Sequence, residues 1–420
     1  MKLDTGVAHQ RLTNGMTFHL LDPDTNLNTV EILAVVKTGA SSDPASKCGI
    51  AHLLEHMTLS GNSMYNKLVR NDIVSSKGIY SNAYTSSDAT IYLLLGPTVH
   101  FEFMLKMMYL DLFEATYREE DTITEREVVA TEIKMRDDNQ GSKFYDFAIR
   151  TAYPKNPYGR CVGGSINCVK NITSDDLKRR ERIKHVGSNI EIIVGGNYDK
   201  LKLEKAIGSL YSQVKSGKPE KLIEPPLWGC NLVSKHNETT ANNAYLGYIF
   251  HDDIDSRQCS TFRASIDAAI SILGVGTSSR MWKELREKRG LCYACGAEHN
   301  VHHGFGNTIL WVNCDTANLA RTSDHLRSIL KKYTKNGVTV KELNTYREHA
   351  RNLSYRTIDD LNEYISLCAH NYIVERNDWE TLRMYMDALD KISVDDVNGA
   401  IYDLLFRQRV YLEQKQTVGF

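Results

Sequence analysis

The sequence predicts an α+β fold of two homologous domains, each a mostly antiparallel sheet packed with helices. Three observations support this fold class. Strand-like and helix-like segments alternate in both halves of the chain. Asn14-Gly15 between apolar stretches is typical of a hairpin turn. Motifs of the first half recur in the second half, in the same order and at an offset of roughly 220 residues. The hairpin and meander patterns argue against a doubly wound parallel sheet.

The strands and helices follow from hydrophobic periodicity. Apolar, β-branched stretches predict strands at residues 30–36, 90–95, 190–194, 245–250, 308–312 and 410–412. Helical spacing of apolar residues predicts helices at 101–113 and 325–333. The predicted strands of the second half stand where the repeat places them, which supports an internal duplication.

Three pairs of segments carry the duplication. Thr124-x-x-Glu127 and Thr339-x-x-Glu342 are both typical of helix capping boxes. Residues 172–177 and 392–397 share an Ile-then-hydroxyl-then-two-Asp pattern, and Met64 and Leu68 correspond to Met281 and Leu285. Between the copies, residues 214–229 hold three of the eight prolines. We therefore expect a domain at 1–213, a linker at 214–229 and a domain at 230–420.

The composition indicates which binding partners and which cellular compartment to expect for this protein. The 420 residues carry a formal net charge of -1, which gives no reason to expect nucleic acid or an anionic membrane as partner. No apolar run approaches the ~18 residues of a membrane span, and residues 1–10 lack the apolar segment of a signal peptide. The nine cysteines are odd in number and scattered, and we interpret Cys292-x-x-Cys295 as a chance pair within a strand. We expect a cytoplasmic protein with reduced thiols.

His52-Leu53-Leu54-Glu55-His56 is the strongest chemical signal in the chain. On a helix, the apolar side carries Ile50, Leu53, Leu54 and Met57, and the opposite side carries His52, Glu55 and His56. Histidines at i and i+4 can converge on one zinc ion. Glu55 lies beside them, where it can accept a proton from metal-activated water. The alternative interpretation is a solvated helix face that happens to hold two histidines.

A second predicted helix supplies carboxylates. We expect it to begin near Thr124, with Thr124 as N-cap and Glu127 at the third helical position. Glu125, Val128, Val129 and Glu132 would then share one face. One carboxylate can complete a zinc site and the other can orient a ligand, whereas each taken alone would be an ordinary surface carboxylate. The equivalent stretch of the second copy, 270–273, is apolar, so only the N-terminal domain can carry this site.

The segment from Gly49 to Met57 resembles the active-site helix of the M16 metallopeptidases, the inverted zincins related to pitrilysin and the mitochondrial processing peptidases. The resemblance implies that His52, His56 and Glu132 hold Zn²⁺, with one ion per chain. Glu132 stands 76 residues after His56, where the family places its third ligand. The resemblance also implies that Glu125 orients a ligand and that Glu55 is the general base of a zinc metalloendopeptidase.

Two further segments resemble substrate-binding elements of the family. Asn82-Ala83-Tyr84-Thr85 is similar to the edge strand that pairs with a bound peptide. The stretch from Leu285 to Tyr293 is similar to a C-terminal element whose Arg and Tyr reach the substrate across a cavity, which implies these roles for Arg286 and Tyr293. Without the resemblance, Arg286 would be a surface helix arginine and Tyr293 a packed strand aromatic.

The chain length resembles the short M16B subgroup, in which two chains close into a clamshell. Because this chain carries both the zinc motif and the Arg/Tyr element, we expect a homodimer that hydrolyses unfolded peptides inside a closed chamber. The competing hypothesis is a non-catalytic structural or partner subunit of the same fold, and a third is a zinc-binding regulator without hydrolysis.

Overall fold

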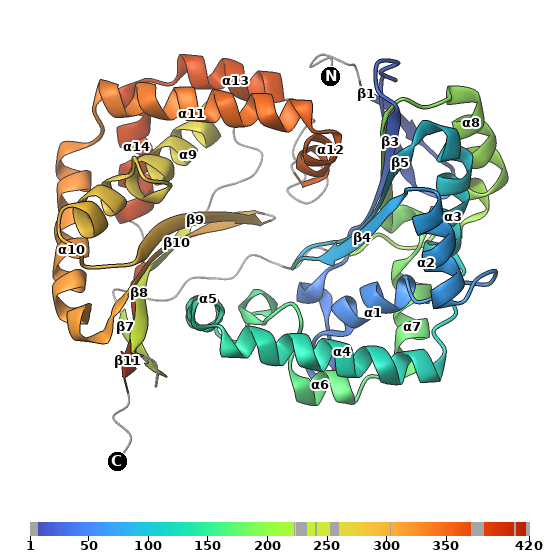
Figure 1. Cartoon of the computed structure of the whole chain (residues 1–420), viewed down its shortest axis with the longest axis horizontal. Coiled ribbons are helices and arrows are strands. Elements are labelled where there is room, and N and C mark those ends of the chain that lie inside the picture. Colours follow the sequence, from blue (N-terminus) through green and yellow to red (C-terminus); the bar gives the residue numbers. More distant parts are fainter. Residues whose placement is uncertain are drawn as a thin grey trace. The chain divides into compact units, whose positions relative to one another are not determined.

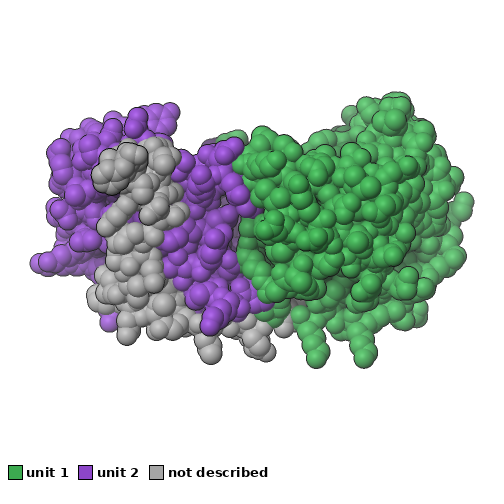
Figure 2. All heavy atoms as spheres, turned by 90° about the horizontal axis from the view of Figure 1, so that it is seen from below, with its two compact units in different colours: residues 1–135, 160–223, 356–374 green, residues 136–159, 224–355, 375–420 purple. Residues whose placement is uncertain are grey.

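The structure is a computed structural model that describes residues 7–221, 223, 233–239, 242–252, 260–302, 304–370, 382–406 and 409–416. The chain divides into two compact units (Figure 2). Unit 1 comprises residues 1–135, 160–223 and 356–374, and unit 2 comprises residues 136–159, 224–355 and 375–420. Each unit contains one sheet and several helices (Figure 1), so the predicted α+β class with two homologous halves is confirmed.

The sheet of unit 1 has six strands in the order β1-β2-β6-β3-β5-β4. Their bounds are β1 (Val7–Arg11), β2 (Thr17–Leu21), β6 (Ile190–Gly196), β3 (Thr29–Val36), β5 (Thr90–Pro97) and β4 (Tyr80–Thr85). Only β2 and β6 run parallel. The β1–β2 hairpin turns at Asn14-Gly15, where Gly15 has a φ of 92°, so the predicted hairpin is confirmed. Among the described strands β4 pairs with β5 alone, and it therefore forms one edge.

The sheet of unit 2 has five strands in the order β7-β11-β8-β10-β9. Their bounds are β7 (Val233–Thr239), β11 (Arg409–Gln416), β8 (Asn243–Asp252), β10 (Phe305–Asp315) and β9 (Ala294–His302). The order repeats that of β2-β6-β3-β5-β4, with one parallel pair, β7 and β11, in the same place. The same topology in both units confirms the duplication. Cys292 precedes β9, so only Cys295 of the C-x-x-C pair lies in a strand.

Helices cover both sheets. The helices of the first copy are α1 (Ile50–Thr58), α2 (Lys67–Ser76), α3 (Phe101–Phe113), α4 (Glu119–Asp138), α5 (Gln140–Ala152), α6 (Ile166–Lys170), α7 (Ser174–Lys184) and α8 (Lys200–Ser209). Those of the second copy are α9 (Ser260–Gly274), α10 (Leu319–Asn336), α11 (Val340–Asp359), α12 (Leu361–Ala369), α13 (Leu382–Lys391) and α14 (Val394–Phe406). The predicted helix at 101–113 is α3, which packs on β3 and β5. None of the described helices has the length and apolarity that crossing a membrane requires.

The two copies exchange one helix each. α5, which follows α4 in the first copy, belongs to unit 2 and packs on β8, with Phe144 stacked on Tyr245 at a ring-centroid distance of 5.7 Å. The equivalent helix of the second copy, α12, belongs to unit 1 and packs on β3 and β6. No feature of the sequence predicted this exchange. The domain boundaries at 213 and 230 stay predictions, and residues 222 and 224–229 of the predicted linker lie outside the described residues.

One of the two predicted capping boxes is wrong. α4 begins at Glu119, so Thr124 lies inside the helix, where its hydroxyl donates to the Glu120 carbonyl at 3.0 Å. The acidic residues 119–121 fill the first turn, where the helix dipole favours negative charge, and they extend the helix beyond the expected start. The equivalent Thr339 is a true cap, because its N–H donates to Glu342 at 2.8 Å and its hydroxyl accepts from the Glu342 N–H at 3.2 Å.

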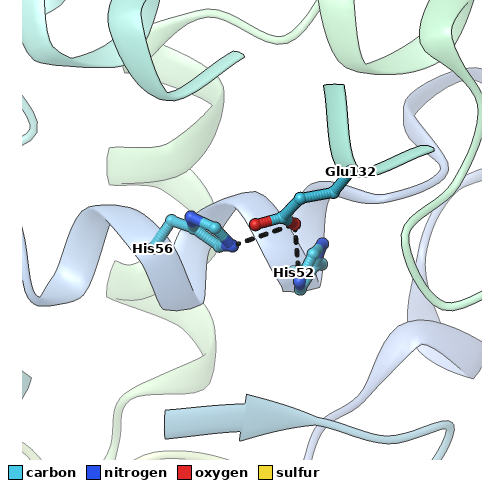
Figure 3. Close-up of side chains that lie close together, drawn as sticks. All are labelled: His52, His56 and Glu132. Atoms are coloured by element: carbon cyan, nitrogen blue, oxygen red, sulfur yellow. Dashed lines mark ion pairs between the residues drawn. The ribbon is translucent and has the colours of Figure 1, made fainter. Parts of the chain in front are cut away.

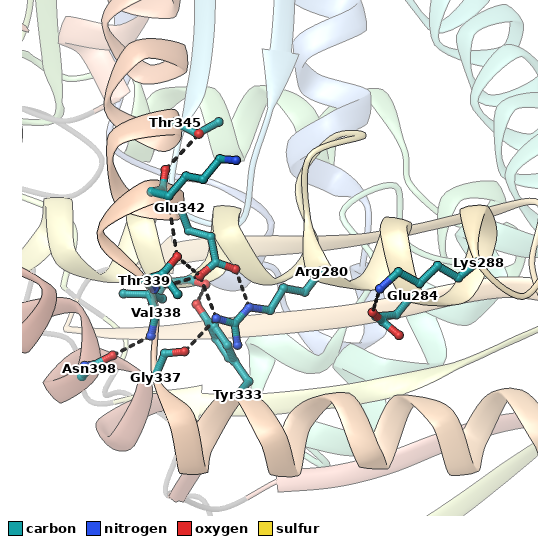
Figure 4. A network of polar contacts seen from close by, with 12 residues as sticks. Arg280, Glu284, Lys288, Tyr333, Gly337, Val338, Thr339, Glu342, Thr345 and Asn398 are labelled. Carbon is teal, nitrogen blue, oxygen red and sulfur yellow. Dashed lines mark hydrogen bonds and ion pairs between the residues drawn. The ribbon is translucent and has the colours of Figure 1, made fainter.

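Glu342 also anchors the turn between α10 and α11 (Figure 4). Arg280 donates to Glu342 at 2.7 Å and to the carbonyl of Gly337 at 2.7 Å, and its guanidinium lies 4.6 Å from the centre of the Tyr333 ring. Tyr333 is buried and donates to the Ala269 carbonyl at 2.6 Å. Arg280, which stands beside the predicted substrate element, is therefore a structural residue of unit 2.

A buried carboxyl group lies under α12. Glu31 of β3 is fully buried, and one of its oxygens accepts from Asn362 of α12 at 2.9 Å. The other oxygen has no hydrogen-bond partner among the described residues. Burial raises the pKa of Glu31 from its ordinary 4.5 to about 8, with the hydrogen bond from Asn362 opposing and Asp360 adding to the rise. The contact between α12 and the sheet therefore contains a carboxyl group that is protonated at neutral pH.

We predict that the stability advantage of Glu31→Gln over the natural chain grows with pH. The unfolded chain loses the Glu31 proton above pH 4.5, whereas the folded chain keeps it up to about pH 8. The natural chain therefore loses stability across this window, by a total on the order of 3–5 kcal/mol. Thermal unfolding of both proteins between pH 4.5 and 8 measures the difference. Glu363→Gln, an exposed change on the same helix, is the control, and a pH-independent difference for Glu31→Gln would contradict the prediction.

Candidate metal centre

A buried carboxylate fixes the start of α1. Gly49, the residue before the helix, has a φ of 92°, and a Cβ there would lie 2.6 Å from the Gly163 carbonyl oxygen, so glycine is required. Asp43 accepts from the Gly49 N–H at 2.8 Å and pairs with Arg180 at 2.9 Å. Burial raises the pKa of Asp43 to about 6, against the lowering effect of Arg180. Asp43 thus takes the place of an N-cap side chain.

The apolar face of α1 packs against α4. All four predicted apolar positions are at most 4% exposed: Ile50, Leu53, Leu54 and Met57. They form one cluster with Val129 and Ile133 of α4. Val128, expected on the same face, is 40% exposed instead, so the buried stripe of α4 is narrower than predicted. This packing brings the polar face of α1 beside Glu132, one turn from Val129.

Three potential zinc ligands converge at this place (Figure 3). Oε2 of Glu132 lies 3.9 Å from Nε2 of His52 and 3.6 Å from Nε2 of His56. One ligand atom from each residue lies within 4.8 Å of the others. Tetrahedral zinc with ligands at ~2.0–2.2 Å sets them about 3.4 Å apart. Two imidazoles and one carboxylate at these separations therefore fit a zinc ion after small side-chain movements, with one coordination position left over.

A carboxylate and a lysine stand behind His56. Glu125 is 4% exposed; its Oε2 lies 3.1 Å from Nδ1 of His56, and its other oxygen pairs with Lys67 of α2. The hydrogen bond with His56 lowers the pKa of Glu125, helped by Lys67 and opposed by burial. A carboxylate at Nδ1 directs Nε2 toward the Glu132 side. Lys67 was not predicted, because a lysine on an amphipathic helix has no distinguishing sequence signal.

Glu55 lies between α1 and the edge strand β4. The residue is 8% exposed, and its Oε2 accepts from the Thr85 hydroxyl at 2.6 Å. Burial raises the pKa of Glu55, while Thr85 and His56 oppose the rise. A carboxylate whose pKa lies above its ordinary range is suited to accept a proton and then release it. The hydrogen bond also joins α1 directly to the edge strand β4.

The predicted substrate strand is β4, and its side chains alternate between two faces. Ala83 and Thr85 are half-buried, and Thr85 faces α1. Asn82 and Tyr84 are exposed on the other face, and Tyr84 hydrogen-bonds to Ser366 of α12. The outer edge of β4 has no partner among the described strands, and the backbone N–H of Ala83 donates to the Asn82 side-chain oxygen at 2.9 Å.

Arg286 and Tyr293 lie together in unit 2. The Arg286 guanidinium lies 4.2 Å from the centre of the Trp282 ring and 5.5 Å from that of Tyr293. Tyr293 is 78% exposed and precedes β9, so the alternative that it is a packed strand aromatic is wrong. Trp282 was not predicted, although its i,i+4 spacing to Arg286 could have indicated the stacking. The role of the pair in substrate binding stays a prediction.

Comparison with known proteins identifies relatives along most of the chain. The family model "Insulinase (Peptidase family M16)" matches residues 20–165, and "Peptidase M16 inactive domain" matches residues 171–349. An uncharacterized zinc protease of Bacillus subtilis, YmxG, is 23% identical over 387 residues, which cover 90% of this chain and 91% of the relative. The zinc protease PqqE of Helicobacter pylori is 24% identical over 401 residues, 92% of this chain and 87% of PqqE.

Solved structures share the fold. The crystal structure of a protease from Helicobacter pylori has a TM-score of 0.87 at 20% identity, covering 98% of this chain and 99% of that one. The periplasmic protease PqqL from Escherichia coli has a TM-score of 0.83 at 15% identity, covering 99% of this chain and 46% of PqqL. Together the two family models span most of residues 20–349, and we conclude that this chain belongs to peptidase family M16.

Proposed function

We propose that this protein is a zinc-dependent endopeptidase. The observation that carries the proposal is the convergence of His52, His56 and Glu132, with Glu125 behind one imidazole. A solvated helix face with two histidines would not require a buried carboxylate and a lysine behind it. The names of the zinc-protease relatives support the same function. The family model "Peptidase M16 inactive domain" matches residues 171–349, which do not include these four residues.

The chain's own residues account for the proton transfers of peptide hydrolysis. Zn²⁺ held at this site would act as a Lewis acid toward the scissile carbonyl and an attacking water. Glu55 accepts the proton of that water and delivers it to the leaving amine. Thr85 holds the Glu55 carboxylate in place through its 2.6 Å hydrogen bond. Glu125 keeps the His56 ring oriented during the cycle.

The substrate would be an unfolded peptide that adds to the edge of β4. Backbone groups along Asn82 to Thr85 would then supply most of the affinity, with little demand on the peptide sequence. Thr85 donates to Glu55, so a peptide bound at this edge lies next to the proposed base. Arg286 and Tyr293 are proposed to hold the peptide from unit 2. A homodimer with a closed chamber and a cytoplasmic location complete the proposal.

The function is tested by hydrolysis of a quenched, unstructured peptide. We expect the zinc-loaded protein to cleave it, a chelator to stop cleavage, and added zinc to restore it. Glu55→Gln should bind one zinc per chain yet reduce the cleavage rate by at least 10²-fold, because the amide cannot accept the proton. Turnover by a zinc-loaded Glu55→Gln protein would disprove the assignment of the base. Tight zinc binding by the natural chain without any cleavage would favour the non-catalytic subunit.

Zinc affinity tests the orienting carboxylate separately. Glu125→Gln should weaken zinc binding about 10–100-fold, because the amide no longer stabilises the correct His56 tautomer with a charge. Competition titration with a chromophoric chelator measures this affinity without reference to activity. Glu127→Gln on the exposed side of the same helix is the matched control and should leave the affinity unchanged. Equal affinities for the two variants would show that Glu125 does not act through His56.

A further inference from the structure

Two cysteine thiols meet beside the start of α1. Cys48 directly precedes Gly49, and Cys168 lies on α6, 120 residues further along the chain. The two thiols hydrogen-bond to each other. Sγ of Cys48 also lies 3.7 Å from the hydroxyl of Ser165, and Sγ of Cys168 lies 3.7 Å from the Ala45 carbonyl oxygen. The proposed zinc chemistry uses neither thiol.

The surrounding backbone holds the two segments in close register. A Cβ on Gly164 would lie 2.2 Å from the Cys48 carbonyl oxygen. The two segments are therefore in contact and leave no room for a side chain at Gly164. Lys47 pairs with Asp176 at 2.6 Å, which ties the Cys48 segment to the start of α7. Both cysteines are half-buried, so both residues are partly exposed to solvent. The thiols are therefore preorganised and accessible.

The two thiols also differ in acidity. Burial raises the pKa of Cys168, but hydrogen bonds from Cys48 and Ser165 outweigh burial and leave this pKa below its ordinary value. Burial and the hydrogen bond to Cys168 raise the pKa of Cys48. A pair with one acidic thiol and one adjacent thiol is the arrangement in which the first attacks and the second resolves.

We propose that Cys48 and Cys168 form a reversible disulfide in exchange with low-molecular-weight disulfides. The Cys168 thiolate attacks one sulfur of the reagent RSSR, forms a mixed disulfide and releases one RS⁻. Cys48 loses its proton and attacks the Cys168 sulfur, which forms the protein disulfide and releases the second RS⁻. Two protein thiols are oxidised and one RSSR is reduced to two RSH.

The disulfide would staple the segment before α1 to α6. It closes a long loop, so it restrains the unfolded chain strongly. Asp43 and Lys47 already hold the segment that carries Cys48 in place. The expected consequence is a more heat-stable protein with α1 unmoved. The second thiol pair, Cys292 and Cys295, is buried in unit 2 and provides an internal comparison.

Oxidised glutathione tests the site. The full-length protein is incubated with it under native conditions, and intact mass and tryptic maps without reduction are recorded, with fragmentation because Cys161 and Cys168 share one tryptic peptide. We expect a mass decrease of about 2 Da, one peptide linking Cys48 to Cys168, and a Tm raised by about 5–10 °C. A reducing agent should reverse all three changes. Cys48→Ser should instead retain glutathione on Cys168, because the resolving thiol is missing.

Cys292→Ser is the matched control and should form the same linked peptide as the natural chain. Glutathione retained on both Cys48 and Cys168 of the natural chain, or a dominant link to another cysteine, overturns the proposal. Formation of the disulfide without a rise in Tm would show that the disulfide does not stabilise the protein. Because the linked peptide is measured on the natural chain, the conclusion does not depend on any variant folding.

Discussion

The packing of α1 against α4 is the constraint on which the site depends. Leu53 and Met57 of one helix and Val129 and Ile133 of the other share a buried cluster. Successive residues of a helix point 100° apart, so a shift of one residue would turn the proposed ligands away from each other. His56 and Glu132 are 76 residues apart in the sequence. This cluster places Nε2 of His56 3.6 Å from a carboxylate oxygen of Glu132. The proposed ligands supply the metal-binding atoms, and the apolar contact sets their positions.

Two short polar relays extend from this packing. One runs from His56 through Glu125 to Lys67, and it keeps a buried carboxylate charged beside an imidazole. The other runs from Glu55 to Thr85 and so joins the proposed base to the edge strand. Because both relays start on α1, the proposed ligand orientation and the proposed substrate position share one rigid element. Because α5 and α12 are exchanged, the sheet that contains β4 is covered by a helix of the second copy. This helix is α12, which packs on β3 and β6.

Much of this arrangement could be read from sequence, because periodicity is local. The strands β3, β5, β6, β8, β10 and β11, the helix α3 and the buried face of α1 follow from hydrophobic spacing alone. The start of α4 could not be placed, since Thr124 fits a capping pattern as well as an interior position. The roles of Lys67 and Asp43 could not be predicted from the sequence, because the residues that they contact lie elsewhere in the chain. The helix exchange was also invisible, because α5 carries the same apolar pattern whichever sheet it covers.

X-ray absorption spectroscopy of the zinc-loaded chain tests whether His52, His56 and Glu132 are the zinc ligands. We expect one zinc per chain with two imidazole nitrogens at ~2.0–2.1 Å and oxygen at ~2.0–2.2 Å. Glu132→Ala should remove one oxygen ligand or replace it with water. A sulfur shell near 2.3 Å would place the metal on cysteines, and an unchanged spectrum for a double change of His52 and His56 to Ala would place it elsewhere. Either result would contradict the proposed set of zinc ligands.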